Sequence, residues 1–479
     1  MSKFTHIPSE IRSVLSKKCY SSVIEAVVSL FESFRFNDKS FGGVKRENCQ
    51  LRNSQLFQLL VLLPFFAVKG FSHYGASALS RMFGGEKSLL YSFAQQDNID
   101  WRGIVYRIAG KLISKTIYRE DSRKSYLPKV LIVDDTDLRK SGKRIENIGF
   151  IFSHARNQFM LGFKALMLCW SDGISQYMLD ASLHGEQGGV SGKKQGLTSE
   201  ERQKRFRRER EEGCCTAQRE SELFMSKIDK LIEMVRRAIR TGVPFDYLLV
   251  DSWFTCTALL KLVSRSRRKF HLLGMAKLGN TKYMTEKWRE LTAKAIIKKL
   301  KDANEIKYSR KLHCYYGCID VALDRYKVRL FLIRQGKKGK WRVLLTTDRS
   351  LDFLRAYEIY AMRWSIEVFF SDSKRILYLE KCSARDFSSQ IAHISLVMIR
   401  YNLLSMVKRL HDYETIGGLY KDVYYGVHEL TVVEKIWDII IEIISIVANL
   451  LGAEEEDLIT QIIDNSERLE ALRIYAKAS

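Results

Sequence analysis

The stretch "VLIVDDTDL", residues 130–138, decides the fold of this chain of 479 residues. Four apolar residues lead directly into two aspartates, Asp134 and Asp135. A second stretch of the same form, "YLLVDSWF" at residues 247–254, ends its apolar run at Asp251. Short apolar runs rich in Val, Ile and Leu are typical of strands that are buried on both faces of a sheet. We therefore predict two buried strands, each delivering a carboxylate to the edge of the sheet.

A third stretch, "YAMRWSIEVFFSDSK" at residues 360–374, has the period of a helix. Four of its polar residues stand at offsets of 0, 3, 7 and 14 positions: Tyr360, Arg363, Glu367 and Lys374. With a rotation of about 100° per residue, their side chains fall within about 60° of one another. The sequence thus predicts one helical face that carries an acid beside a tyrosine and two cations.

Three acids from these stretches, Asp135, Asp251 and Glu367, form a predicted metal site. Carboxylate oxygens suit hard divalent cations such as Mg2+. Two such ions, about 3.5–4 Å apart, can cleave a phosphodiester by activating the attacking oxygen and stabilising the leaving oxygen. Asp134 and Asp135 point to opposite faces of their strand, so only one of them can be the primary ligand. Asp135 is favoured as that ligand because it precedes Thr136, and Asp134 is the alternative. The simpler alternative to a metal site is that these acids only cap the turns that follow the strands.

The charge of the chain agrees with a polyanionic partner. There are 79 Lys and Arg against 55 Asp and Glu, a net charge of +24. Nucleic acid is the commonest partner of so basic a protein, and a protein with solvated basic loops is the alternative. The nine cysteines are irregularly spaced, as expected for reduced thiols. No second Cys/His pair accompanies His313, Cys314 and Cys318, so we do not expect a structural zinc.

We expect a cytoplasmic protein without a membrane partner. The first residues lack the apolar core of a signal peptide. The apolar stretch 56–68 contains Pro64, and the stretch 436–452 is interrupted by Asp438 and Glu442. Neither reaches the roughly 20 apolar residues that a membrane span needs, so both are predicted to be buried helices.

The pattern along the chain predicts an α/β protein with a mixed sheet between helical ends. Residues 1–125 read as a helical DNA-binding region, and 413–479 as a helical C-terminal region. Residues 126–277 and 348–412 form the two parts of the core, separated by a block of short alternating strands at 278–347. We expect this block to be an insertion in the catalytic sheet rather than an independent domain.

A basic run, "GKKQGLTSEERQKRFRRERE" at residues 192–211, lies within the first part of the core. Such runs are usually solvated helix faces with ion pairs between residues four apart. Contact with phosphate through Arg205, Arg207 or Arg208 is the alternative.

The helical stretch has the pattern Y-x2-R-x3-E-x6-K, with Trp364 after the arginine. Together with "VDDT" and "VDSWF" upstream, it resembles the signature of bacterial insertion-sequence transposases of the DDE type, in particular the "YREK" branch. The resemblance spans about residues 126–410. It implies an RNase H-like mixed sheet interrupted by a β-rich insertion.

The resemblance also implies roles for individual residues. Asp135, Asp251 and Glu367 match the catalytic ligands of two Mg2+ ions, for which Mn2+ can substitute. Tyr360, Arg363 and Lys374 match the residues that hold the backbone of the transposon end. Relatives place a tryptophan on the strand before this helix, where it stacks on a flipped base. The role of Trp341 stays open, because a slip of one residue would turn its side chain to the opposite face.

The implied activity is cut-and-paste transposition by a homodimer or paired-end complex. The chain would bind the terminal inverted repeats of its own element and release a 3′ hydroxyl. That hydroxyl would form a hairpin, and after reopening the end would attack target DNA. A catalytically inactive DNA-binding descendant and a metal-dependent nuclease without strand transfer are the alternatives.

Overall fold

The computed structural model of the chain describes residues 33–42, 51–118 except 67, 69, 78 and 81–83, 127–185, 197–422 except 288 and 412, and residue 446. Residues 1–32, 43–50 and 119–125 of the predicted N-terminal region therefore lie outside the described residues. So does nearly all of the predicted C-terminal region, including the apolar stretch 436–452 apart from residue 446. None of the described helices is long and apolar enough to cross a membrane.

The first six strands form the core of the sheet. They are β1 Val130–Arg139, β2 Gly149–Ser153, β3 Gln158–Ser171, β4 Gln176–His184, β5 Tyr247–Val250 and β6 His271–Ala276. Strand β1 pairs antiparallel with β3 and parallel with β5, while β4 pairs with β3 and β5 pairs parallel with β6. The resulting order, β4-β3-β1-β5-β6, is that of an RNase H-like mixed sheet, as expected from the sequence.

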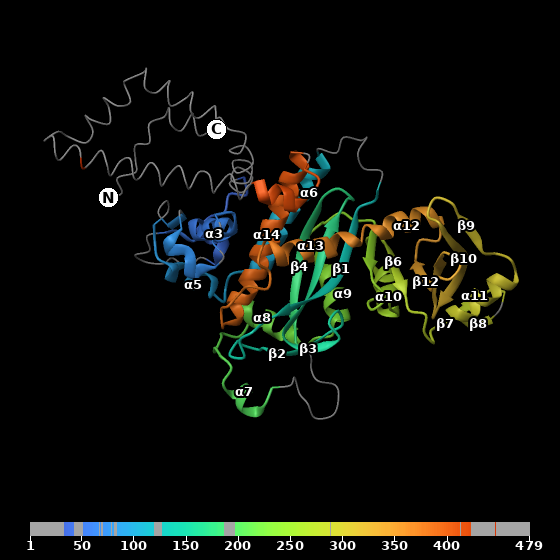
Figure 1. Cartoon of the computed structure of the whole chain (residues 1–479), viewed down its shortest axis with the longest axis horizontal. Coiled ribbons are helices and arrows are strands. Elements are labelled where there is room, and N and C mark those ends of the chain that lie inside the picture. Colours follow the sequence, from blue (N-terminus) through green and yellow to red (C-terminus); the bar gives the residue numbers. More distant parts are fainter. Residues whose placement is uncertain are drawn as a thin grey trace, which may run out of the picture.

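The strands of the core are buried because helices cover the sheet. Along β3 and β4 nearly every residue is buried, including the charged Lys164 of β3 and Asp180 of β4. Helix α14, Phe387–Leu410, is buried over most of its length and packs on β4 and on α6, Trp101–Tyr118. Helix α13, Trp364–Arg375, packs on β1, whereas α9, Lys227–Arg240, packs on β3 and β4 (Figure 1).

The strands of residues 278–347 continue the same sheet. They are β7 Lys282–Thr285, β8 Arg289–Thr292, β9 Lys307–Ser309, β10 Cys314–Leu323, β11 Tyr326–Gln335 and β12 Trp341–Thr346. Strand β12 pairs antiparallel with β6, and the order continues through β11 and β10 to β7 and β8. Figure 1 shows this part of the sheet, with helix α11 (Ala293–Asp302), at the end of the molecule away from α3 and α5. The domain boundaries themselves remain predictions.

The remaining elements connect and flank the sheet. They are η1 Asp38–Phe41, α3 Asn53–Leu62, η2 Leu63–Phe66, η3 Phe71–Ala76, α5 Lys87–Ala94, α7 Ser199–Gln203, α8 Cys215–Ser221, η4 Glu222–Phe224, α10 Thr257–Arg265 and α12 Phe353–Ala361. Several aromatic side chains join η1, α3, α5 and α6 into one packed cluster, in which Phe57 lies 6.1 Å from Trp101 and 5.1 Å from Phe41 between ring centroids.

One prediction about helices is wrong. The stretch 360–374 is not a single helix, because α12 ends at Ala361 and α13 begins at Trp364. Between them the backbone tightens: the N–H of Arg363 donates to the carbonyl of Tyr360 at 3.0 Å. Such bonds between residues three apart make a tighter turn than the α-helix does. Tyr360 therefore belongs to a different helix from Glu367 and Lys374.

Candidate functional site

Strand β1 sends its two acids to opposite faces of the sheet. One oxygen of Asp134 (Oδ2) accepts a bond from the Arg363 guanidinium (Nη1) at 2.9 Å, at the start of α13. The carboxylate of Asp135 is instead paired with the ammonium group of Lys227, at the start of α9. Alternation along a strand explains this split. The face of β1 under α13 thus carries Asp134, not Asp135.

Asp251 lies beside Asp134 on the neighbouring parallel strand. The paired residues include Leu131 with Leu248 and Ile132 with Leu249. Continuing this register by two residues beyond the pairing sets Asp134 next to Asp251, and partners in a parallel pair point to the same face. The backbone N–H groups of Trp253 and Phe254 donate to Asp251 Oδ1 at 2.8 and 3.1 Å. This turn fixes the orientation of the Asp251 carboxylate.

Arg363 joins the third acid to the group. One guanidinium nitrogen reaches Asp134 and the other donates to Glu367, one helical turn further along α13. The side chains of Arg363 and Asp134 are 16% and 17% exposed, whereas that of Glu367 is 33% exposed. Among the sequence-predicted ligands, the structure therefore brings Asp251 and Glu367 toward Asp134, the residue named as the alternative. We call Asp134, Asp251, Arg363 and Glu367 the acid cluster.

The acid cluster has an excess of negative charge in a poorly solvated position. Burial raises the pKa of Asp134 to about 7, although Arg363 opposes that rise, and the charges of Asp251 and Asp135 add to it. The same environment raises the pKa of Tyr360 to about 12, mainly by burial. The phenol of Tyr360 therefore keeps its proton at neutral pH and can donate a hydrogen bond.

The donor set fits a divalent cation in its chemistry. Carboxylate oxygens are the ligands that Mg2+ and Mn2+ prefer. A bound cation would stabilise the ionised form of Asp134, whose pKa is raised first by burial and then by the neighbouring acids. In this structure Arg363 stands between Asp134 and Glu367 and supplies that positive charge. With the side chains as they stand, no group of three His, Cys, Asp or Glu residues in the described part of the chain could hold a metal ion.

Lys374 contacts β1 further along the strand. Its ammonium group (Nζ) donates to the carbonyl of Asp137 at 2.7 Å and pairs with Glu380 at 3.0 Å. Seven residues separate Lys374 from Glu367, which is about 10 Å along a helix. Of the three predicted DNA-contacting residues, Arg363 lies within the acid cluster, Tyr360 lies beside it on α12, and Lys374 lies two turns away.

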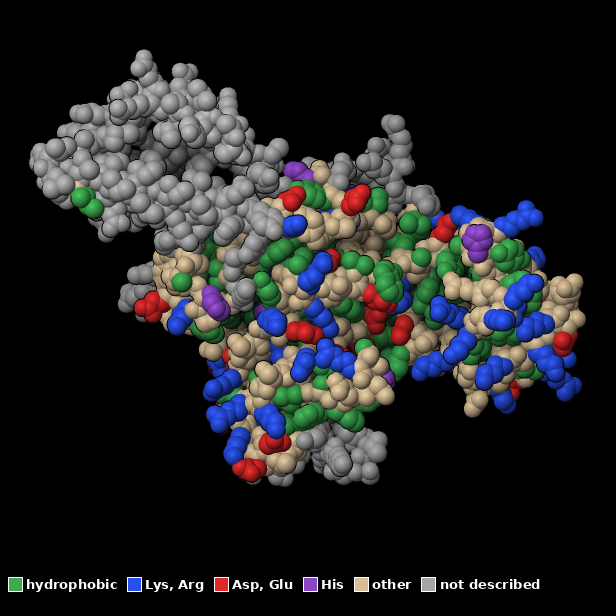
Figure 2. Space-filling model, viewed as in Figure 1, with side chains coloured by type: hydrophobic (Ala, Val, Ile, Leu, Met, Phe, Trp, Pro, Cys, Tyr) green, Lys and Arg blue, Asp and Glu red, His purple; other side chains and the backbone are tan. Residues whose placement is uncertain are grey.

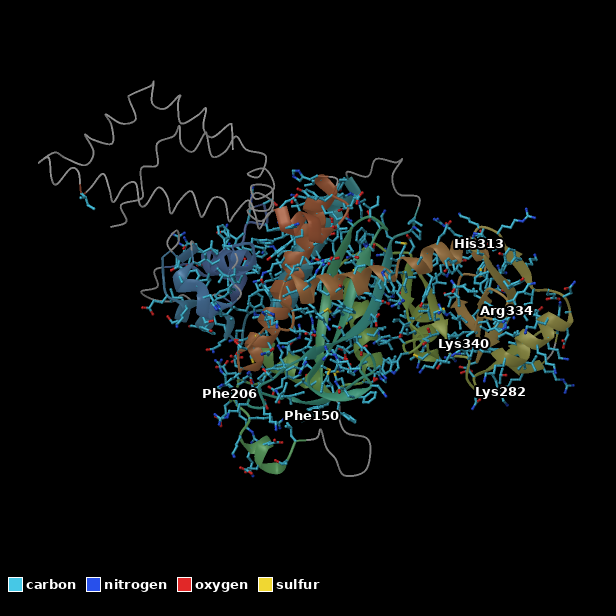
Figure 3. The ribbon with its side chains drawn as sticks, viewed as in Figure 1. Phe150, Phe206, Lys282, His313, Arg334 and Lys340 are labelled. Carbon is cyan, nitrogen blue, oxygen red and sulfur yellow. The ribbon has the colours of Figure 1, made fainter. Side chains whose placement is uncertain are left out.

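A cavity of about 370 Å³ opens beside the acid cluster. Its lining includes Tyr360, Arg363 and Trp364 from the helical side, and Lys340 and Arg342 from the β-rich strands. Figure 3 shows Lys340 on that β-rich part of the molecule. Cations and aromatic rings thus share one hollow next to the acids.

Trp341 does not line this cavity, whereas Arg342 and Leu344 of the same strand do. Since successive side chains of a strand point to opposite faces, Trp341 lies on the other face. In register, Trp341 pairs with Arg334, and the Arg334 guanidinium carbon lies 5.0 Å from the centre of the Trp341 ring. Lys301 of α11 lies 5.4 Å from the same ring. The tryptophan is therefore on the α11 face of the strand, turned away from Tyr360. The role of Trp341 stays open.

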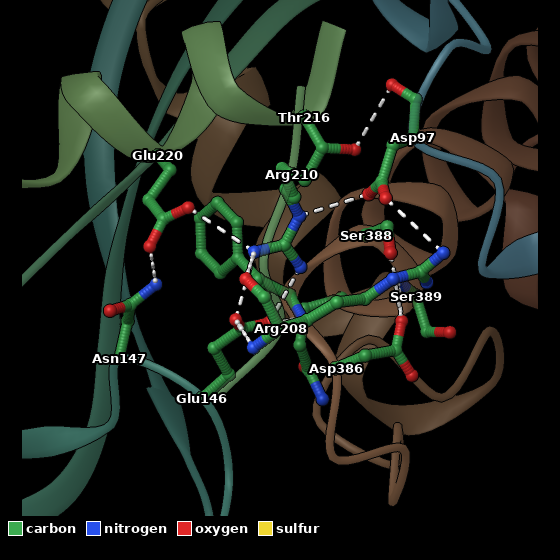
Figure 4. A network of polar contacts seen from close by, with 12 residues as sticks. Asp97, Glu146, Asn147, Arg208, Arg210, Thr216, Glu220, Asp386, Ser388 and Ser389 are labelled. Atoms are coloured by element: carbon green, nitrogen blue, oxygen red, sulfur yellow. Dashed lines mark hydrogen bonds and ion pairs between the residues drawn. The ribbon is translucent and has the colours of Figure 1, made fainter. Parts of the chain in front are cut away.

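Three arginines of the basic run at 192–211 make contacts within the fold: Arg205, Arg208 and Arg210. Figure 4 shows Arg208 and Arg210 in a network of polar contacts with Asp97, Glu146 and Glu220. Arg210 is almost fully buried and pairs with Glu146 at 2.7 Å. Arg205 likewise donates to the carbonyl of Ile148 at 2.9 Å. These contacts favour a structural role over contact with phosphate for Arg205 and Arg208.

Comparison with known proteins finds similarity to DNA endonucleases and transposases. A family model described as "DDE superfamily endonuclease" matches residues 73–276, and one described as "Transposase DDE domain" matches residues 226–403. No curated protein matches the sequence. Among solved structures, a piggyBac transposase synaptic complex with hairpin DNA is similar at 13% identity, with 84% of this chain and 80% of that chain covered and a TM-score of 0.42. The two family matches overlap and together run from residue 73 to residue 403, so over this part of its length the chain is similar to DDE-type endonucleases and transposases.

Proposed function

We propose that the chain cleaves DNA with divalent metal ions held by Asp134, Asp251 and Glu367. The observation that carries this proposal is the shared position of the three acids, with Arg363 joining Asp134 to Glu367 and the parallel register setting Asp251 beside Asp134. In this proposal Asp134 has the ligand role that the sequence pattern favoured for Asp135. The physical reason is that Asp135 lies on the α9 face and is paired with Lys227.

The side chains around the acids support cleavage of a phosphodiester. When bound, divalent metal supplies an activated oxygen nucleophile and stabilises the leaving oxygen. Arg363 can bind a phosphate oxygen, because its guanidinium carries several donors and a fixed positive charge. The protonated Tyr360 can donate to another phosphate oxygen, while Lys374 adds positive charge two turns along α13. Mg2+ is the proposed ion, with Mn2+ as a substitute.

The proposed substrate is double-stranded DNA that carries the terminal inverted repeats of an insertion sequence. Residues 278–347 contain 18 Lys and Arg against 6 Asp and Glu, which supports a polyanionic partner. Figure 2 shows these cations spread over the surface of that part of the molecule. The Y-x2-R-x3-E-x6-K pattern supports the YREK branch, and with it cut-and-paste transposition through a hairpin by a homodimer in a paired-end complex.

The test uses the full chain and a DNA fragment bearing the sequences that flank its gene. With Mg2+, the expected products are a nick at the repeat end, a hairpin, and ends joined to a target plasmid. Asp134→Asn should remove all three products while DNA binding persists. Cleavage without joined products would support the nuclease alternative, and binding without any cleavage would support the inactive descendant.

A further inference from the structure

A second positively charged feature lies away from the acid cluster, between α9 and α10. The groove between these helices has a volume of about 940 Å³. Five exposed cations line it: Arg236, Arg240, Lys261, Arg265 and Arg267. We call this feature the α9–α10 groove.

The cations of the groove are arranged as two rows. Arg236 and Arg240 are four residues apart on α9, and Lys261 and Arg265 are four residues apart on α10. Residues four apart share one helical face, so each helix presents a like-charged pair to the groove. Like charges at this spacing destabilise a helix, and a bound polyanion would reverse that effect.

The acids near the groove do not neutralise these rows. In the described part of the chain, none of the five cations has an ion-pair partner. The two acids in the lining are Asp229 and Glu233, and Glu233 is already paired with Lys230. Arg237, also in the lining, is paired with Asp180 and so is not counted among the five. The groove therefore keeps an excess of uncompensated positive charge.

The groove is too far from the acid cluster to be part of it. Helix α9 begins at Lys227, whose ammonium group contacts Asp135, and ends at Arg240. The thirteen intervening steps correspond to about 20 Å along the helix. Nucleic acid held by Arg236 and Arg240 is thus contacted away from the point of cleavage.

The chemistry of the lining distinguishes between paired and unpaired nucleic acid. Surfaces that bind unpaired strands combine cations with aromatic rings on which bases stack. The described lining of the groove contains no aromatic side chain; its apolar members are Ile232, Ile239, Ala258 and Leu262. Arginine side chains recognise phosphate, and phosphate contacts carry affinity without reading sequence.

We propose that the α9–α10 groove binds the phosphate backbone of double-stranded DNA, at a segment outside the cleavage point. This inference rests on the proposed action of the chain on DNA. The groove supplies sequence-independent affinity and orients the bound segment relative to the acid cluster.

The test measures binding of the full chain to a 30-base-pair duplex of arbitrary sequence, as fluorescence anisotropy across a salt titration. Arg236→Ala with Arg265→Ala removes one cation from each row. The slope of log K against log salt should become shallower by about 1.8, since each lost phosphate contact contributes about 0.9. A matched control, Arg144→Ala with Arg156→Ala in the exposed turns on either side of β2, removes the same charge and should change the slope by less than half as much.

The outcomes separate failure of this inference from failure of the proposed function. Equal changes of the salt slope in the two double variants, or an unchanged slope in the groove variant, would show that the groove does not bind DNA. Either result would leave the proposed cleavage of DNA unaffected. If the groove variant lost binding to a 30-nucleotide oligothymidine as much as binding to the duplex, the groove would bind unpaired strands, and its assignment to double-stranded DNA would be wrong. A wild-type chain that binds neither DNA would remove both proposals. Because the substituted side chains are exposed, thermal unfolding of both variants should match the wild type.

Discussion

The two faces of strand β1 differ sharply in how they use adjacent acids. On the α13 face, Asp134 shares Arg363 with Glu367 and lies beside Asp251. On the α9 face, Asp135 has one close partner, Lys227, which also lies 5.2 Å from the centre of the Trp253 ring. One face thus gathers acids around a single arginine, while the other pairs one acid with one cation.

This difference shows why neighbouring carboxylates need not share a role. Carboxylates that lie close together in a buried position repel one another, and a bound metal ion stabilises their ionised forms. An acid that is already paired one-to-one has little such demand, and removing its partner changes mainly local stability. The contrast predicts large catalytic effects on the α13 face and small ones on the α9 face.

The largest expected effect is the difference between Asp134→Asn and Asp135→Asn. If Asp134 binds metal, its replacement should lower the rate of Mg2+-dependent nicking more than about 10³-fold, because metal stabilisation of the transition state is worth several kcal/mol. Asp135→Asn should lower the rate less than about tenfold. Initial rates on one DNA substrate measure both. The reverse order of effects would restore Asp135 as the ligand.

The second effect concerns Arg363, which we expect to contact DNA when metal occupies the acids. Arg363→Ala should slow nicking about 10²-fold and make the salt slope of end binding shallower by about 0.9, the value for one phosphate contact. Arg363→Lys should restore the salt slope but only part of the rate, because lysine cannot bind in a bidentate way. A salt titration with normal slope and normal nicking in Arg363→Ala would show that the arginine only balances the acids.

Much of this arrangement is predictable from the sequence, within limits that have physical causes. Asp251 and Glu367 stand at the end of an apolar strand and on an amphipathic helix, so local patterns identify them. The choice between Asp134 and Asp135 depends on which face α13 covers, and alternation alone cannot supply that information. Positions 362 and 363 hold Met and Arg rather than Gly or Pro, so the sequence does not mark the break between α12 and α13.

The two basic regions show the same limit. The run at 192–211 is conspicuous in the sequence, yet Arg208 and Arg210 are paired within the fold. The cations of the α9–α10 groove, such as Arg240 and Arg265, are scattered over some thirty positions and come together only when the two helices pack. A dense run of charge along the sequence is thus a weaker guide than charge left unpaired by tertiary structure.

A third, smaller effect tests the one-to-one pairing on the α9 face. Asp135→Ala and Lys227→Ala should each lower the free energy of unfolding by about 1 kcal/mol, since both side chains are only partly buried. The double variant should be less destabilised than the sum of the two, with a coupling energy of about 0.5–1 kcal/mol. Urea unfolding of the four proteins measures this coupling. A coupling near zero would mean that the pair is incidental.

The smallest effect is a pH dependence of stability from His184, which lies on the same face of the sheet as Asp135. In register, Asp137 pairs with Lys164, and Lys164 pairs with His184. Burial, aided by the charges of Lys227 and Lys230 and opposed by that of Glu222, lowers the pKa of His184 to about 4. His184 Nε2 also lies 2.7 Å from the hydroxyl of Ser182.

The sign of the effect follows from these pKa values. An unfolded histidine takes up a proton near pH 6.5, whereas folded His184 does so only near pH 4. Between these values the unfolded state binds more protons, so stability is fully present above pH 6.5 and is lost as the pH falls toward 4. The loss should be about 1–3 kcal/mol, and His184→Gln should flatten that part of the curve. Thermal midpoints of both proteins from pH 7 to pH 4 measure it; identical slopes would show that other groups on this face carry the acid sensitivity.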